Sequence, residues 1–190
     1  MPKELDRAQL FTFAQTHRQE YEDLLQRFVE TPTVSCDPAY AEDIRKGVEL
    51  TVETLRRFGG EAEVYQANKG NPVVHGVFGN DKNLPTITVY NHMDVQPASK
   101  ETEPWDTEPF VMTKKGDSYF GRGTTDDKGP ALAALYGARA ALEAARAAFE
   151  RAEQLRESAR SESGRRAQHD DARADRHRAK EHGECAEALS

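Results

Sequence analysis

Two short runs, residues 91–94 and 121–129, carry side chains that coordinate divalent metal ions. The first run contains His92 and Asp94, and imidazole and carboxylate are both natural ligands of zinc-class metals. These residues are two positions apart, so in extended backbone their side chains face the same way. A carboxylate in that place can reach the second imidazole nitrogen and orient a metal-bound histidine. Taken alone, the spacing also fits a polar strand end that faces water.

The second run places two adjacent aspartates, Asp126 and Asp127, between glycines and just before a predicted helix. Neighbouring carboxylates repel each other, and a shared cation would relieve that repulsion. The alternative is an acidic turn that caps the helix beginning at Pro130. Both runs lie at the ends of predicted strands in one α/β unit, and open α/β sheets bind ligands beyond the carboxyl ends of strands. Taken together, the two runs predict one metal-binding site.

The residues before the first run predict two helices followed by strands. Apolar residues recur at steps of three and four, the period of a helix face, over residues 10–28 and 40–55. The period then changes to two, which predicts strands over residues 61–66, 73–78 and 86–90. The third of these strands is predicted to be central in its sheet and to lead directly into the first run.

The chain changes character near residue 145, after a predicted hairpin over residues 110–120 and the helix from Pro130. Residues 146–190 contain nine arginines and ten alanines but no valine, isoleucine, tyrosine, tryptophan or methionine. So few large apolar groups cannot anchor the segment to a core. We therefore expect helix over residues 141–160 and disorder or frayed helix after Gly164. No heptad repeat indicates a coiled coil.

Length, charge and cysteine content argue against several classes of function. A chain of 190 residues can bury one ordinary core. Its net charge of −7 and lack of a basic stripe argue against binding to nucleic acid. No apolar run is long enough to span a membrane, and the N-terminus lacks the apolar stretch of a secretory signal. Cys36 and Cys185 are far apart, which favours unpaired thiols and a cytoplasmic location.

Three motifs, in order, resemble those of the di-zinc metallopeptidases that include carnosinase, cytosolic dipeptidases, acetylornithine deacetylase and succinyl-diaminopimelate desuccinylase. The motifs are residues 90–98, 103–110 and 121–130, and residues 28–35 also resemble the first loop of that family. Two elements, Val95-Gln96-Pro97 and the stretch from Trp105 to Pro109-Phe110, are most similar to the dipeptidase branch. The resemblance covers roughly residues 8–145. It implies an α/β fold. Residues 1–145 would form an incomplete three-layer α/β/α catalytic domain with a mixed sheet, and residues 146–190 would form a non-homologous Ala/Arg/Glu-rich tail.

The resemblance also implies a role for each matched residue. His92 would ligate one zinc ion, Asp94 would orient His92, and Asp126 would bridge two zinc ions. The peptide bond from Asp126 to Asp127 is expected to be cis. The implied reaction is hydrolysis of an amide bond in a small peptide or N-acyl amino acid, with a metal-bound water as the nucleophile. Cobalt or manganese could replace zinc, because imidazole and carboxylate suit several divalent metals.

The chain departs from that family after the second run. The family has a Glu-Glu pair, the general base and a zinc ligand, a few tens of residues past the bridging aspartate, and residues 146–190 contain no such pair. The lid or dimerisation domain, through which intact members are often homodimeric, is also absent from the sequence. An incomplete sheet would leave an exposed edge, so we expect poor solubility.

Three hypotheses therefore remain open. The first is a fragment of a dipeptidase, inactive or nearly so alone, joined to a tail from a frameshift or a truncated gene. The second is a metallohydrolase that obtains its missing ligands from a partner chain. The third is a non-catalytic metal-binding or interaction module. Metal content and dipeptide hydrolysis, measured with and without added metal, would discriminate between them.

Overall fold

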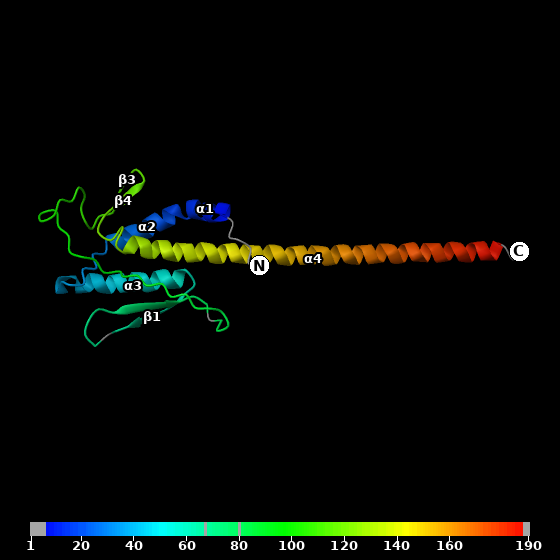
Figure 1. Cartoon of the computed structure of the whole chain (residues 1–190), viewed down its shortest axis with the longest axis horizontal. Helices are drawn as coiled ribbons and strands as arrows, with labels where there is room; N and C mark the ends of the chain where they lie inside the picture. Colours follow the sequence, from blue (N-terminus) through cyan, green and yellow to red (C-terminus); the bar gives the residue numbers. More distant parts are fainter. Residues whose placement is uncertain (1–6, 67, 80, 188–190) are drawn as a thin grey trace. The chain divides into compact units, whose positions relative to one another are not determined.

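The structure is a computed structural model that describes the backbone of residues 7–66, 68–79 and 81–187, and the side chains of these ranges up to residue 162. The chain divides into two units, Met1–Leu142 and Glu143–Ser190. The described residues contain four helices, one 3-10 turn and four short strands, joined by loops (Figure 1). In chain order they are α1 (Arg7–Thr16), α2 (Arg18–Val29), η1 (Pro38–Tyr40), α3 (Ala41–Arg57), β1 (Glu61–Tyr65), β2 (Val73–Val77), β3 (Thr113–Lys115), β4 (Ser118–Phe120) and α4 (Lys128–Glu187).

The helix predicted over residues 10–28 is present as two helices, α1 and α2, which are separated at His17. The His17 ring stacks on Phe13 with 4.0 Å between ring centroids, and its Nε2 lies 3.1 Å from Arg139 Nη2. His17 is thus packed against side chains of α1 and α4. The second predicted helix is confirmed as α3.

The core of the first unit is formed by α2, α3 and the first turns of α4. Apolar side chains at helical spacing on these three elements bury one another, and burial contributes about 1.5–3 kcal/mol for each large side chain. Tyr136 of α4 packs edge-on against Tyr21 and Phe58, with ring centroids 5.3 and 5.0 Å apart. The buried members of the cluster are Leu24, Leu25, Phe28, Val29, Leu50, Leu132 and Tyr136.

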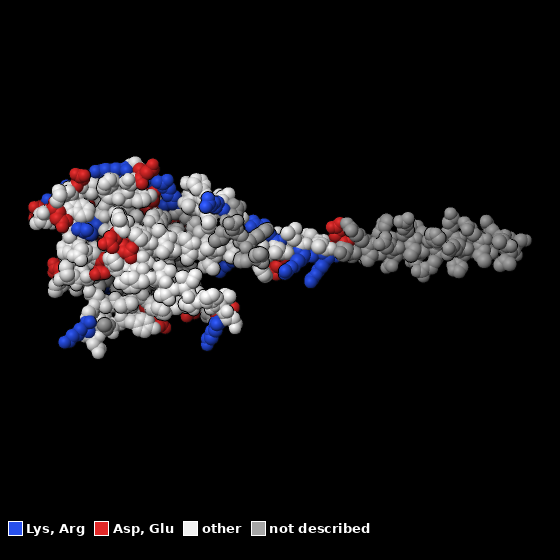
Figure 2. Space-filling view, in the orientation of Figure 1, with Lys and Arg blue, Asp and Glu red and all other residues white. Residues whose placement is uncertain are grey.

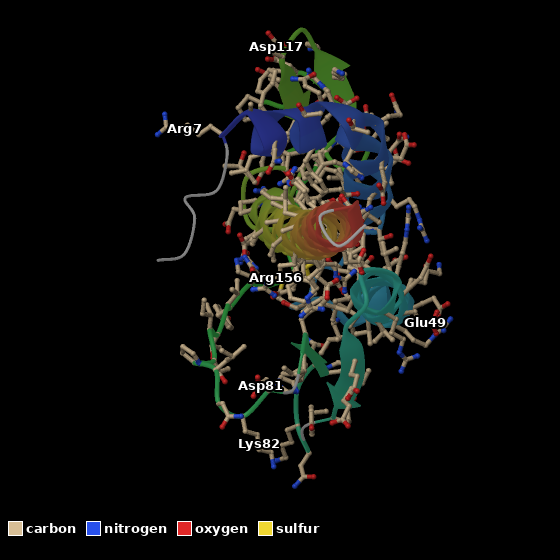
Figure 3. The ribbon with its side chains drawn as sticks, turned by 90° about the vertical axis from the view of Figure 1, so that its right-hand side faces the viewer. Arg7, Glu49, Asp81, Lys82, Asp117 and Arg156 are labelled. Carbon is tan, nitrogen blue, oxygen red and sulfur yellow. The ribbon has the colours of Figure 1, made fainter. Side chains whose placement is uncertain are left out.

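The described strands form two separate antiparallel hairpins, β1–β2 and β3–β4. The first hairpin packs against α3 (Figure 1). A Cβ atom added at Gly76 of β2 would lie 2.8 Å from Leu55 Cδ2, so the Leu55 side chain packs directly over this glycine. The second hairpin turns at Gly116, where φ is 60°, and its tip carries Asp117 (Figure 3). The sequence predicts a hairpin over residues 110–120, and the observed hairpin begins three residues later, at Thr113.

The predicted central strand over residues 86–90 is wrong for this structure, and so is the predicted mixed sheet. The segment is extended, but it belongs to neither of the two sheets. Its side chains are exposed, with fractions of 87% for Ile87, 65% for Val89 and 84% for Tyr90. β-Branched and aromatic residues favour a strand only where neighbouring strands cover them, and none of the described strands lies beside this segment.

The second unit is helical throughout its described backbone, because α4 continues to Glu187. The sequence analysis predicts helix over residues 141–160 and disorder or frayed helix after Gly164, so the structure has more helix than expected. Alanine, arginine and glutamate favour helix, and no proline follows Pro130. The two large apolar side chains described in this unit, Phe149 and Leu155, are 62% and 71% exposed.

The described surface carries side chains of both charges. On the face shown in Figure 2, described basic and acidic side chains are interspersed and form no continuous basic area. Among the described helices, none combines the length and the apolar character that crossing a membrane requires.

Candidate metal centre

The structure brings together the two predicted metal ligands, His92 and Asp126, although 34 positions separate them in the sequence. His92 Nε2 lies 3.0 Å from Asp126 Oδ1. Both side chains are open to solvent, with exposed fractions of 38% for His92 and 85% for Asp126. An imidazole nitrogen and a carboxylate oxygen that converge in this way offer two donors to one zinc-class ion.

Asp94 lies at the other nitrogen of the same imidazole ring. His92 Nδ1 is 3.0 Å from the backbone carbonyl oxygen of Asp94 and 3.5 Å from its carboxylate Oδ1. The carbonyl is therefore the nearer acceptor, and the carboxylate stands just beyond hydrogen-bond distance. The other carboxylate oxygen, Oδ2, accepts a hydrogen bond of 2.6 Å from Ser35 Oγ.

The surroundings of His92 favour its protonated form. Burial lowers the pKa of His92, but the hydrogen bonds to Asp94 and Asp126 and the charges of both carboxylates outweigh burial, and the pKa is raised above its ordinary value. Because a metal binds only the neutral imidazole, a proton competes with the metal at this position.

Asp127 links the two runs and does not join Asp126 at the imidazole. Its carboxylate Oδ2 accepts hydrogen bonds from Asn91 Nδ2 at 2.8 Å and from the backbone nitrogen of His92 at 3.1 Å. The peptide bond between Asp126 and Asp127 is cis, as predicted. Sequence reasoning gives Asp127 only a share in a bound cation, whereas the structure shows a carboxylate that fixes the backbone of the first run.

Lys128, within the second run and directly after the two aspartates, is fully buried. Its Nζ donates hydrogen bonds of 2.8 Å to the backbone oxygens of Phe28 and Thr31, at the end of α2. Burial lowers the pKa of Lys128 to about 7, against an opposing effect of the Asp94 charge. At Gly123, where φ is 96°, an added Cβ would lie 2.9 Å from Lys128 Cδ. The loop therefore packs tightly on this lysine, which sequence reasoning missed.

Arg122 joins the second run to the loop that follows the first. Its Nη2 donates to the backbone oxygen of Pro97 at 3.3 Å and pairs with Glu103 Oε2 at 3.5 Å. The guanidinium carbon lies 5.1 Å from the centre of the Trp105 ring, a cation–π distance. Trp105 Nε1 donates to Glu103 Oε2 at 2.5 Å, which closes the cluster. The predicted Trp-to-Pro-Phe motif thus supports the backbone near the site.

The donor set fits two ligands of a zinc-class ion and is short of a complete site. Among the described side chains, no group of three or more histidine, cysteine, aspartate or glutamate residues is arranged to hold a metal. Catalytic zinc sites use three protein ligands and a water molecule. Cys36 is a free, exposed thiol, and the side chains of His169, His177 and His182 lie outside the described residues. Two convergent donors on loops of an α/β unit define a candidate metallohydrolase centre.

Comparisons with known proteins give the same class. A model of the peptidase family M20/M25/M40 matches residues 88–167. The chain is 36% identical over 134 residues to the Cys-Gly metallodipeptidase dug1 of Schizosaccharomyces pombe, covering 65% of this chain and 28% of that protein. It is 31% identical over 136 residues to the Beta-Ala-His dipeptidase of Rattus norvegicus, covering 65% of this chain and 27% of that protein.

Solved structures agree with these sequence matches. The dipeptidase Dug1p from Saccharomyces cerevisiae has a TM-score of 0.66 and 26% identity, and the match covers 76% of this chain and 32% of that one. Human carnosine dipeptidase 1 has a TM-score of 0.62 and 29% identity, with coverage of 70% and 31%. Over part of its length the chain is therefore similar to members of the peptidase family M20/M25/M40, which confirms the predicted resemblance. Its match spans about 28% of the length of the first curated relative.

Proposed function

We propose that residues 91–94 and 121–127 form part of the metal centre of a zinc-dependent, dipeptidase-like amide hydrolase. His92 would bind the ion through Nε2, and Asp126 would bind it through its carboxylate. The family resemblance implies that Asp126 would bridge two ions in an intact site. The main support is the 3.0 Å approach of His92 Nε2 to Asp126 Oδ1. The match of residues 88–167 to the M20/M25/M40 peptidase family supports the same function.

Each residue of the centre has a distinct part in this proposal. A bound zinc-class ion supplies a nucleophilic water near neutral pH and polarises the carbonyl of the substrate. Asp94 holds the proton of His92 at Nδ1, so that Nε2 is free to act as a ligand. Asp127 and Lys128 hold the backbone on either side of the ligands. The proposed substrates are small peptides or N-acyl amino acids, because the relatives above are Cys-Gly and Beta-Ala-His dipeptidases.

We expect residues 1–190 alone to bind metal weakly and to show little or no turnover. The proposed centre has two protein ligands for an ion that requires three in catalytic sites, and no described residue is assigned as general base. Additional polypeptide, from a longer chain or a partner subunit, would have to supply these groups.

A non-catalytic module is the second candidate function. The observation that favours it is the exposed extended segment 84–90, in which Leu84, Ile87, Val89 and Tyr90 are each at least 65% exposed. Such a segment can add a strand of another chain by backbone pairing. Stoichiometric, tight metal binding without hydrolysis by any assembled form would favour this function.

Hydrolysis of the dipeptides Cys-Gly and β-Ala-His, measured with purified protein and added zinc, cobalt or manganese, tests the proposal. The assay is run on residues 1–190 alone and after mixing with a separately produced C-terminal portion of a related dipeptidase. We expect turnover only in the mixture. This turnover should be lost when the mixture contains the Asp126→Asn variant in place of wild-type residues 1–190. Turnover that survives Asp126→Asn in the mixture would contradict the assignment, and turnover by residues 1–190 alone would contradict the incomplete site.

A further inference from the structure

Residues 33–35, which connect α2 to η1, bind three consecutive residues of the loop that carries the proposed metal ligand His92. Thr33 Oγ1 donates to the backbone oxygen of Met93 at 2.5 Å, and the backbone oxygen of Thr33 accepts from the nitrogen of Val95 at 3.0 Å. Ser35 Oγ donates to Asp94 Oδ2 at 2.6 Å. Every residue from 93 to 95 is thus held by this connecting segment.

The connecting segment is itself rigidly placed. Thr33, Val34 and Val95 have exposed fractions of 4%, 0% and 5%, and Val34 pairs with Val95 in a parallel bridge. A Cβ atom added at Gly47 of α3 would lie only 2.5 Å from Thr33 Cγ2, so α3 packs directly on the segment. A buried segment with these contacts cannot follow the movements of the more exposed loop that it binds.

Thr31, just before this segment, contacts the second run. Lys128, which immediately follows the two aspartates, donates from Nζ to the backbone oxygen of Thr31, two residues before Thr33. The residues after α2 therefore position both runs from one side. Among the side chains of residues 33–35, the Ser35 hydroxyl donates a hydrogen bond to a carboxylate of the proposed centre, and this bond restrains the direction in which the Asp94 side chain points.

The Asp94 carboxylate divides its two oxygens between two neighbours. Oδ2 accepts from Ser35, and Oδ1 faces His92 Nδ1 at 3.5 Å. The Asp94 side chain is 49% exposed, so without the serine it could rotate toward water and leave the imidazole. A hydrogen bond to a charged acceptor is about twice as strong as one between neutral groups, which is enough to select one rotamer.

We propose that Ser35 is a positioning residue of the metal centre: its hydroxyl holds the Asp94 carboxylate 3.5 Å from His92 Nδ1, beside the Asp94 carbonyl oxygen that lies 3.0 Å from the same nitrogen, and so helps to keep the ligand nitrogen of His92 aimed at the metal. This inference rests on the proposed function, because it assumes that His92 is a metal ligand. Thr33 fixes the backbone of the same loop, and Ser35 fixes the side chain that orients the ligand.

Cobalt(II) titration of residues 1–190, followed by visible absorption, measures the effect of Ser35 on metal binding. We expect Ser35→Ala to weaken cobalt binding by about three- to tenfold, less than the loss typical of a direct partner of a ligand. Ser35→Thr, which keeps the hydroxyl, should restore it. Thr31→Ala is the matched control, because its hydroxyl, in the same connection, donates to the backbone oxygen of Arg27 and not to the site.

The metal-free protein supplies a second readout that does not depend on metal binding. Long-range proton–nitrogen spectra at one fixed pH report which nitrogen of the His92 ring carries the proton. At a pH where the ring is neutral, we expect a larger share of the form protonated at Nδ1 in the wild type and in Ser35→Thr than in Ser35→Ala. Circular dichroism verifies that each variant is folded.

The two readouts separate failure of the inference from failure of the proposed function. Unchanged ring spectra in folded Ser35→Ala would overturn the positioning role, and so would cobalt binding equal to that of the wild type. A wild-type chain whose bound cobalt leaves the His92 ring signals unaffected would contradict His92 as a ligand, and with it both proposals. Equal weakening by Thr31→Ala would also overturn the inference, since the loss would then reflect the connection as a whole.

Discussion

Glu22→Gln should destabilise the protein in a manner that depends on pH. The Glu22 side chain, 11% exposed on α2, accepts hydrogen bonds from Arg18 Nε at 2.9 Å, from Lys114 Nζ at 2.7 Å and from Tyr119 Oη at 2.7 Å. Lys114 and Tyr119 belong to the β3–β4 hairpin, which leads directly into the second run. The carboxylate therefore attaches the hairpin to the helical core.

The magnitude follows from the pKa of Glu22. Hydrogen bonds from Lys114, Arg18 and Tyr119 lower this pKa from 4.5 to about 2. That difference corresponds to about 3 kcal/mol of stability at neutral pH. Since the Lys114 and Arg18 side chains are 41% and 45% exposed, solvent screens the charges, and we expect about 1–2 kcal/mol.

The sign of the pH dependence is fixed by the lowered pKa. A carboxyl group with a lower pKa in the folded state stabilises the protein fully above its unfolded pKa of about 4.5 and loses this contribution as the pH falls through about 2. Glutamine resembles the protonated acid. The difference between the wild type and Glu22→Gln should therefore be largest at pH 7 and should disappear near pH 2.

Urea unfolding at low protein concentration, followed by circular dichroism between pH 7 and pH 2, measures this difference. Glu53→Gln is the matched control, because Glu53 forms an ion pair with Arg27 but is 57% exposed, and we expect less than about 1 kcal/mol from it. A loss in Glu22→Gln that is independent of pH, or no larger than in Glu53→Gln, would refute the reasoning.

Two further predictions concern the scaffold. Lys128→Met should reduce the free energy of unfolding, measured by urea titration, by about 1–3 kcal/mol, because the backbone oxygens of Phe28 and Thr31 lose their hydrogen-bond donor. An unchanged free energy of unfolding would contradict this prediction. Ile87→Lys combined with Val89→Lys should reduce self-association in light scattering, since both side chains lie 65% or more exposed on an unpaired segment. A monodisperse wild-type protein would contradict the predicted aggregation.

Local features of this chain could be predicted from the sequence, because they depend on near neighbours. The period of three and four residues gives α2 and α3, and the composition gives helix over residues 141–160 but not its continuation to Glu187. The family motifs give the cis peptide bond between Asp126 and Asp127. The two runs together also predict one site that contains His92 and Asp126, and these side chains meet at 3.0 Å although the strand expected before the first run is absent from the described sheets.

Features that depend on distant contacts could not be predicted in this way. Residues 86–90 have strand composition, but a strand also needs partners, and the described strands pair elsewhere. The buried role of Lys128 comes from carbonyl groups at the end of α2, about 100 positions away. The bond from Ser35 to Asp94 spans 59 positions, and no spacing rule connects them.

The central claim is that His92 and Asp126 are ligands of one metal ion, and equilibrium zinc binding by single variants tests it most directly. His75→Ala is the matched control, because His75 is an exposed histidine on β2, which packs against α3. The account predicts that His92→Ala and Asp126→Asn each weaken zinc binding by about tenfold or more, whereas His75→Ala binds like the wild type. Equal zinc affinity in all four proteins would contradict it.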